Sequence, residues 1–201
     1  GWKEDFHMTY MNEIPAQKHA LTYLEDFFKQ YPKRKVIIAG HSKGGNLAVY
    51  AASQIQPELQ KKISAIYTYD APGLQAHLTE TTGYQDIIPK IHRYVPQGSV
   101  IGMMLEVPDT PIVVRSLALG GIAQHNTFSW QTEGTHFVQL EAISTESLQI
   151  KDTLKEWVDS VPDEELELYF DLFFGTILES GISSINELSS KNAIDHIRQL
   201  V

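Results

Sequence analysis

Cysteine is absent from the 201-residue chain, which excludes a disulfide scaffold and a cysteine-ligated zinc or iron–sulfur site. Long hydrophobic runs are missing too: no stretch approaches 18 uncharged apolar residues, so the sequence predicts no stable membrane span. The histidines are scattered and no His-Glu-x-x-His occurs, so nothing indicates a metal site. We expect neither a metal nor a cofactor, and the lack of cysteine favours a cytoplasmic location.

Basic residues do not outnumber acidic ones in either part of the chain. Residues 1–140 carry 12 acidic and 12 basic side chains, whereas residues 141–201 carry 13 acidic and 4 basic ones and hold the whole net charge of −9. Neither part offers the basic surface that phosphate backbones require, so nucleic-acid binding is not expected. The acidic C-terminal part is typical of a solvated helical surface, with a partner-docking site as the alternative.

What is present is the composition of a globular chain, 42% apolar and 20% charged, with a length that suits one domain. Apolar residues recur at three- and four-residue steps over 15–31 and 46–55, which predicts two helices. Runs rich in β-branched residues at 35–40 and 63–69 predict strands, the first of them continuously buried. Strand, helix and strand in this order indicate a βαβ unit with parallel strands.

The second half of the chain continues this pattern. Residues 92–95 predict a third strand, 111–116 fit either a strand or the start of a helix, and 135–142 alternate as a half-buried edge strand does. From residue 144 the spacing is helical, with a stop at Pro162 and further helices predicted over 163–178 and 184–201. We therefore expect an α/β core with a mainly parallel sheet over residues 1–143. A helical segment over residues 144–201 is expected to pack on this core or extend it.

A serine lies where the first predicted strand turns into a helix. Residues 40–44, Gly-His-Ser-Lys-Gly, fit G-x-S-x-G, a weak signal alone and a strong one at a strand-to-helix turn. There the backbone of Ser42 is expected to be strained, with its hydroxyl clear of the sheet. The backbone N–H of Lys43 would face the site at a helix N-terminus as an oxyanion donor. A glycine-rich turn with an incidental serine is the alternative.

Small residues are needed around such a turn because strand and helix pack closely there. We expect Gly40 and Gly44 to meet this need and Gly45 to add room. The residues expected to form the turn around Ser42 are Gly40, His41, Gly44 and Gly45.

A serine nucleophile needs a base, and the base needs an acid that orients it. In this architecture the order along the chain is serine, acid, histidine, which excludes the histidines at 7, 19 and 41. His125 lies in a loop-like stretch late in the sheet and is the preferred base, with His136 as the alternative. The histidines at 77, 92 and 196 fit less well by position.

The preferred acid is Asp70, which closes the strand at 63–69. It falls at the carboxyl end of a strand next to the one that leads to Ser42, where open α/β sheets place their sites. The Pro-Gly that follows fixes a turn. Asp109 and Asp86 are the competing acids, and turn capping is the structural alternative for Asp70.

With these residues placed, the chain resembles the lipase branch of the α/β-hydrolases. Residues 40–48 are similar to the elbow of class 3 lipases, and 66–73 resemble the strand and turn that carry the acid in pancreatic-type lipases. The chain is most similar to a bacterial family of uncharacterised lipase-like hydrolases, which shares these segments, Val-Pro-x-x-Ser at 95–99 and His-x-x-x-x-Trp-Gln at 125–131. The resemblance spans most of residues 1–140 and implies Ser42 as nucleophile, Asp70 as acid and His125 as base.

Two departures from the lipase pattern stand out. Class 3 lipases carry their acid after an arginine-containing strand, here 92–95, and Ser99 stands at the matching position. Trp2 and Asp5 resemble residues that follow the oxyanion loop of lipases, so this chain is expected to begin after the second oxyanion donor. We therefore expect a sheet that lacks strands on its N-terminal side and exposes an edge or an apolar face there.

The sequence thus predicts a serine hydrolase of lipase or esterase type, whose substrate is a small-molecule ester or lipid with an apolar acyl group. Residues 100–105 either line an acyl-chain pocket or belong to the core. A non-catalytic hydrolase-fold binding or scaffold protein is the alternative from another class, favoured by Ser99 and the missing oxyanion loop. A thioesterase or peptidase is the alternative among enzymes, because the same triad serves all three bonds.

Overall fold

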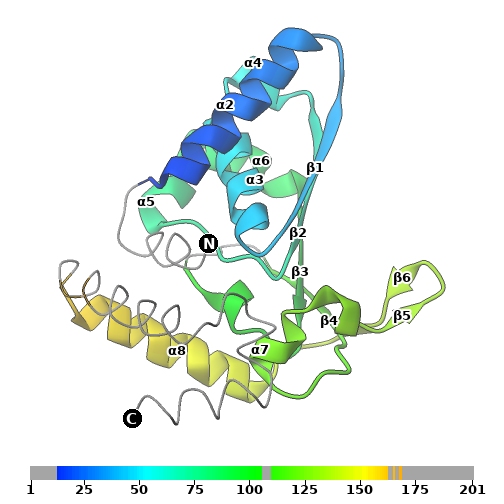
Figure 1. Cartoon of the computed structure of the whole chain (residues 1–201), viewed down its shortest axis with the longest axis vertical. Helices are drawn as coiled ribbons and strands as arrows, with labels where there is room; N and C mark the ends of the chain where they lie inside the picture. The colour runs from blue at the N-terminus through cyan, green and yellow to red at the C-terminus, as the bar shows by residue number, and fades with distance from the viewer. Residues whose placement is uncertain (1–12, 106–109, 163–164, 166–167, 169–201) are drawn as a thin grey trace, which may run out of the picture.

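The computed structural model describes residues 13–105, 110–162, 165 and 168 (Figure 1). Helices (α), 3-10 turns (η) and strands (β) alternate along them. In order they are α2 (Pro15–Gln30), β1 (Val36–His41), α3 (Lys43–Gln54), α4 (Pro57–Gln60), β2 (Ile63–Tyr69), α5 (Ala76–Thr79), α6 (Thr82–Ile87), η1 (Ile88–Lys90), β3 (Ile91–Pro96), η2 (Ile101–Met103), β4 (Ile112–Val114), α7 (Gly121–Gln124), η3 (Thr127–Ser129), β5 (Thr132–Glu133), β6 (His136–Phe137), β7 (Gln139–Leu140) and α8 (Thr145–Ser160).

The main sheet has five strands in the order β1-β2-β3-β4-β7. Neighbours among β1, β2, β3 and β4 run parallel, and β7 lies antiparallel to β4. The predicted α/β class and mainly parallel sheet are therefore present. The ambiguous stretch at 111–116 contains a strand, β4, whose residues pair with the end of β3.

Strand β1 lies at one edge of the described sheet. The expectation that it is continuously buried is wrong, because intermediate and exposed residues alternate along it. Ile37 is 65% exposed. Among the described helices, α3 packs on β1, and alternate side chains of the strand are exposed.

The expected edge strand over 135–142 is two short strands instead. Strand β6 forms a separate two-stranded ribbon with β5, and β7 joins the main sheet. Val138 lies at the switch: its N–H donates to the Gln131 carbonyl and its own carbonyl accepts from the Arg115 N–H. The chain changes hydrogen-bond partners between β6 and β7, so one alternating segment serves two sheets.

Helices α2, α3 and α6 pack on the same side of the sheet (Figure 1). Their apolar side chains meet those of β1 and β2 in a core that includes Phe28, Ile66 and Ile87. A buried polar link crosses this layer as well. Gln17 of α2 donates to Asn46 of α3 over 3.0 Å, and Asn46 donates to the Gly73 carbonyl. These bonds tie the helix that follows Ser42 to the turn that follows Asp70.

The opposite face of the sheet carries half-buried rings in register. Tyr67 stacks on His92 with centroids 4.8 Å apart, and Tyr69 stacks on Tyr94 at 5.7 Å. Phe137 packs edge-on against Tyr69 at 6.4 Å. Its position at the end of the β5–β6 ribbon brings that ribbon to this face of the sheet.

The helix expected from residue 144 is α8, and it ends before Pro162. Its start is tied to the core, because the Ser144 N–H donates to the Gln97 carbonyl over 2.7 Å. The helices predicted over 163–178 and 184–201 lie outside the described residues, apart from 165 and 168. Within the part of the chain that the structure describes, no helix is long and apolar enough to cross a membrane.

Candidate active site

Ser42 occupies a sharp turn between β1 and α3. Its φ of 55° and ψ of −132° lie outside the regions that ordinary residues adopt, as expected for a strained strand-to-helix turn. The Ser42 N–H donates to the Tyr69 carbonyl at the end of β2 over 3.0 Å. The turn is thereby fixed at the carboxyl edge of the sheet. Lys43 is the first residue of α3, so its backbone N–H lies at the N-terminus of that helix.

Two glycines make this turn possible. A Cβ on Gly40 would lie 2.2 Å from the Gly44 backbone, and one on Gly45 would lie 2.4 Å from the Ala71 Cβ. The expectation that Gly44 must be small is wrong, because no described atom outside the adjoining backbone of its own helix lies within 4 Å of a Cβ placed there. The helix meets the neighbouring chain through Gly45, while Gly44 faces outward.

Asp70 directly follows β2 and is completely buried. Its φ of 45° is a second strained backbone position, held by a 2.8 Å hydrogen bond from the Asp70 N–H to the Tyr94 carbonyl of β3. One carboxylate oxygen, Oδ1, accepts from the Ser99 hydroxyl and from the Gly102 N–H at 3.1 Å. A buried carboxylate needs such donors, because water cannot reach it.

His125 follows α7 and is buried against Asp70. Its Nδ1–H donates to Asp70 Oδ2 over 2.6 Å, so the structure brings the preferred acid and the preferred base into direct contact. Because Nδ1 carries the proton, the neutral ring leaves Nε2 as a proton acceptor. The loop is held by Trp130, whose indole N–H donates to the Gln124 carbonyl over 2.8 Å.

His41 joins this pair to the serine turn. Its Nε2–H donates to the His125 carbonyl over 2.9 Å, and the two rings lie 4.5 Å apart. Partial burial lowers the pKa of His41 below its ordinary value. The sequence excluded His41 as a base by its order in the chain and missed this contact. Its place directly before Ser42 was the available signal.

The structure does not join all three candidate residues by hydrogen bonds. Among the described contacts, none links the Ser42 hydroxyl to the His125 ring. The competing residues lie elsewhere: His136 is on the exposed β6, His92 stacks on Tyr67, and Asp86 and His77 are exposed on α6 and α5. Outside the described residues lie the histidines at 7 and 196, Asp109, Trp2 and Asp5.

Ser99 has a role that the sequence did not indicate. It is fully buried, and its hydroxyl donates to Asp70. Its own carbonyl accepts from the Ser147 hydroxyl, so α8 reaches the hydrogen bonds behind the acid. The serine that departs from the class 3 pattern thus touches the preferred acid directly. No local pattern in the sequence connects residues 70, 99 and 147.

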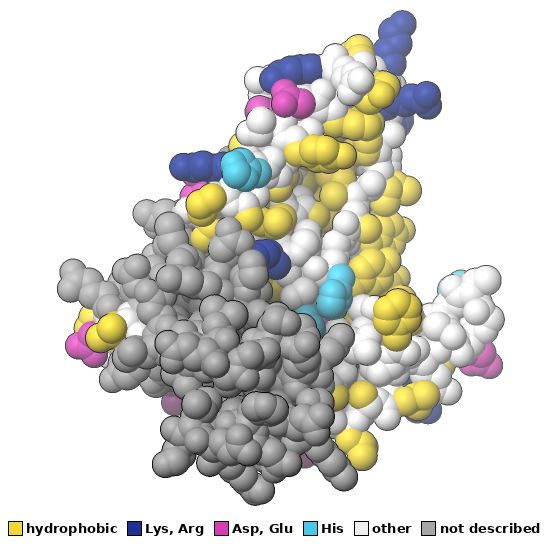
Figure 2. Space-filling view, in the orientation of Figure 1, with side chains coloured by type: hydrophobic (Ala, Val, Ile, Leu, Met, Phe, Trp, Pro, Cys, Tyr) yellow, Lys and Arg dark blue, Asp and Glu magenta, His cyan; other side chains and the backbone are white. Residues whose placement is uncertain are grey.

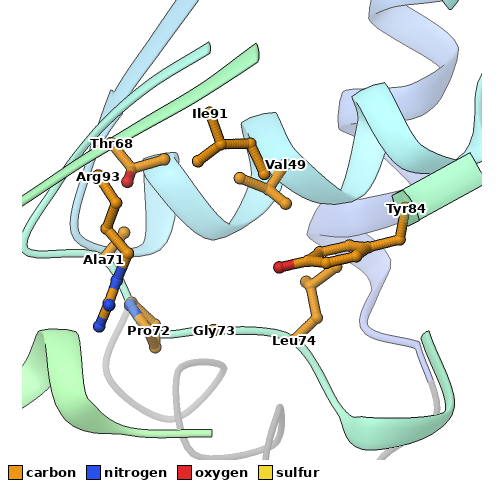
Figure 3. A pocket seen from close by; sticks show the side chains of 9 residues that line it. All are labelled: Val49, Thr68, Ala71, Pro72, Gly73, Leu74, Tyr84, Ile91 and Arg93. Carbon is orange, nitrogen blue, oxygen red and sulfur yellow. The ribbon is translucent and has the colours of Figure 1, made fainter. Parts of the chain in front are cut away.

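A small pocket lies on the helix-covered side of the sheet (Figure 3). It is lined by Val49, Thr68, Ala71, Pro72, Gly73, Leu74, Tyr84, Ile91 and Arg93. Neither Ser42, Asp70 nor His125 contributes to it, and no residue of 100–105 does so. Within that run, Met103 is buried and the Gly102 carbonyl accepts from buried Arg93. Among the described residues no group of acidic or histidine side chains could hold a metal ion.

Comparison with known proteins adds one finding. A family model described as Mbeg1-like matches residues 1–175, which include every residue of the site. No curated protein and no solved structure matches the chain.

The packing at the turn predicts opposite effects for neighbouring glycines. Gly45→Ala should lower the free energy of unfolding by about 1–3 kcal/mol, because the new methyl group would overlap Ala71. Gly44→Ala is the matched control and should leave stability unchanged or raise it by up to about 1 kcal/mol, since alanine favours the helix. Urea unfolding measures both. An equal loss in the two variants would contradict the packing described.

The lowered pKa of His41 predicts a pH dependence of stability. In the window from that lowered pKa up to about 6.5, the unfolded chain binds more protons at His41 than the folded chain. The free energy of unfolding should therefore rise with pH across this window. His41→Gln keeps an N–H donor toward His125 and should flatten the rise, whereas His19→Gln, on the exposed side of α2, should not. Urea unfolding between pH 5 and 8 tests this, and equal slopes in wild type and His41→Gln would refute it.

Proposed function

Because the chain belongs to the Mbeg1-like family, a lipase-like family, we propose that it is a serine hydrolase of the lipase or esterase type. The observation that carries the proposal is the 2.6 Å bond between Asp70 and His125, next to the strained turn of Ser42. The substrate class is a carboxylic ester with an apolar acyl group. The likeness of residues 40–48 to the elbow of class 3 lipases is part of the same proposal.

In the proposed first step, His125 Nε2 takes the proton from the Ser42 hydroxyl, whose oxygen attacks the ester carbonyl carbon. Asp70 stabilises the imidazolium through the Nδ1–H bond. The oxygen that becomes negative accepts the Lys43 N–H at the start of α3, where the helix dipole also favours negative charge. His125 then gives its proton to the departing alcohol, leaving an acyl group on Ser42.

In the second step, water replaces the alcohol. His125 takes a proton from the water, whose oxygen attacks the acyl carbonyl, and the bond to Ser42 breaks as the proton returns to the serine. His41 supports both steps as a positioning residue, because its bond to the His125 carbonyl fixes the base beside the serine turn.

The second candidate function is a non-catalytic binding or scaffold protein. The lack of a hydrogen bond between the Ser42 hydroxyl and the His125 ring among the described contacts favours it. The hydrogen bond between the buried side chains of Asp70 and His125 argues against it, since a carboxylate that only capped a turn would not require a buried histidine partner. Catalytic hydrogen bonds are also often formed only when substrate is bound.

Two broader expectations belong to the same proposal. Residues 1–143 form the hydrolase core, and residues 144–201 form a helical attachment to it. The bonds from Ser144 to Gln97 and from Ser147 to Ser99 support an attachment that packs on the core. A cytoplasmic location is proposed from the lack of cysteine and of a visible membrane anchor in the sequence.

The nucleophile is tested with a fluorophosphonate probe on the full chain. We expect wild type to be labelled and Ser42→Ala not to be, since the probe reacts with an activated serine hydroxyl. Ser53→Ala, which removes a buried serine on α3, should be labelled like wild type. Labelling of Ser42→Ala at the wild-type level would overturn the assignment of the nucleophile. A wild type that is not labelled would favour the binding protein.

Ser99→Ala tests the support of the acid. Loss of a hydrogen bond to a charged group costs about 1.5–3 kcal/mol, so kcat on p-nitrophenyl esters should fall by about tenfold or more. KM should stay unchanged, because Ser99 is fully buried and cannot touch substrate. Ser53→Ala controls for the loss of any buried hydroxyl. A kcat equal to that of wild type would show that Ser99 has no part in holding Asp70.

A further inference from the structure

Residues 116–128, which carry His125, bury several polar side chains and expose their large apolar ones. The polar side chains of Ser116, Gln124 and His125 are buried. The large apolar side chains point outward instead: Leu117 is 71% exposed, Leu119 94% and Phe128 96%, and Ile122 is also exposed. We call these four residues, Leu117, Leu119, Ile122 and Phe128, the apolar rim. Single exposed apolar residues are common on protein surfaces, whereas several large ones exposed close together mark interaction sites.

The backbone that carries the apolar rim is held by hydrogen bonds. The Leu117 N–H donates to the Ser129 carbonyl over 2.8 Å, which brings the backbone on either side of Leu117 and Phe128 together. Gln124 holds the other end, because its side chain donates to the Ala118 carbonyl at 3.1 Å and accepts from the Gly98 N–H at 2.8 Å. The apolar side chains therefore stand out from a hydrogen-bonded framework.

The backbone beneath the rim is closely packed. Gly121, beside Ile122, already packs so closely that a Cβ there would lie 2.5 Å from the Gly98 carbonyl oxygen. Figure 2 shows separate apolar side chains on the surface near the β5–β6 ribbon.

The distribution of charged residues indicates which kind of partner the rim could bind. The chain carries a net charge of −9, yet residues 110–132 contain no Asp or Glu and one basic residue, Arg115. Carboxylates are thus excluded from the segment that exposes its apolar side chains. A surface of this kind can enter the lipid interface without burying a negative charge, which is costly there.

We propose that the apolar rim docks the protein on a lipid surface, with Leu119 and Phe128 inserted among the acyl chains. The docking proposal rests on the exposure of the rim, on its hydrogen-bonded backbone and on the absence of acidic residues from its segment. Its use, which is to bring His125 and Ser42 to esters within the lipid layer, rests on the proposed function. Because the rest of the chain is acidic, zwitterionic lipid suits the rim better than a strongly anionic surface.

The test is co-sedimentation of the full chain with phosphatidylcholine vesicles, in a Ser42→Ala background so that no turnover alters the lipid. We expect this protein to partition onto the vesicles. The double variant Leu119→Ser with Phe128→Ser should lose about 100-fold or more in partition coefficient, at about tenfold or more for each side chain. Tyr23→Ser is the matched control, because Tyr23 is 76% exposed on α2, away from the rim, and its loss should leave binding unchanged.

Several outcomes would overturn the proposal. One is no binding of the parent protein to vesicles, and another is binding of the double variant at the parent level while its thermal unfolding stays normal. A third is a self-association of the parent that the double variant loses in sedimentation equilibrium without lipid, because the rim would then be a protein interface. Vesicle binding with no fluorophosphonate labelling of wild type would reject the hydrolase and keep the docking surface, so the two failures are separable.

Discussion

A carboxylate that water cannot reach organises this end of the molecule. Asp70 is completely buried, so its two oxygens depend on donors that the fold itself supplies. Those donors come from separate parts of the chain: the Ser99 hydroxyl and the Gly102 N–H after β3, and the His125 ring after α7. Removing the His125 ring would take the described donor from Oδ2, and removing Ser99 or the Gly102 N–H would leave Oδ1 with one donor in place of two. The acid and these loops therefore hold one another in place.

The parallel sheet makes two strained backbones tolerable at this place. Ser42 and Asp70 both have positive φ, and each lies directly after a strand. The Ser42 N–H donates to the end of β2, and the Asp70 N–H donates to β3, so each strained residue is hydrogen-bonded to the next strand along the sheet. Hydrogen bonds to the neighbouring strand ends therefore help to offset the backbone strain at both residues. The two side chains leave the sheet from the same edge.

Much of this could be predicted from the sequence because the signals are local. Helix and strand periodicity located α2, β1, α3 and β2, and the order of serine, acid and histidine pointed to the pair that the structure joins. The burial of β1, the split of 135–142 and the outward position of Gly44 were predicted wrongly, since each depends on which distant segments lie alongside. The bonds from Ser99 to Asp70 and from His41 to His125 span 29 and 84 positions and leave no pattern to read.

The bond from Ser147 to the Ser99 carbonyl has a consequence for the order in which the chain is made. Translation delivers the residues at 42, 70, 99 and 125 first, yet the support behind the acid is completed only when the start of α8 has left the ribosome. A nascent chain that stops before residue 147 holds Ser42, Asp70 and His125 without the last of their scaffolding. The hydrogen bonds behind the acid are thus completed only after the whole sheet and the start of α8 have been synthesised.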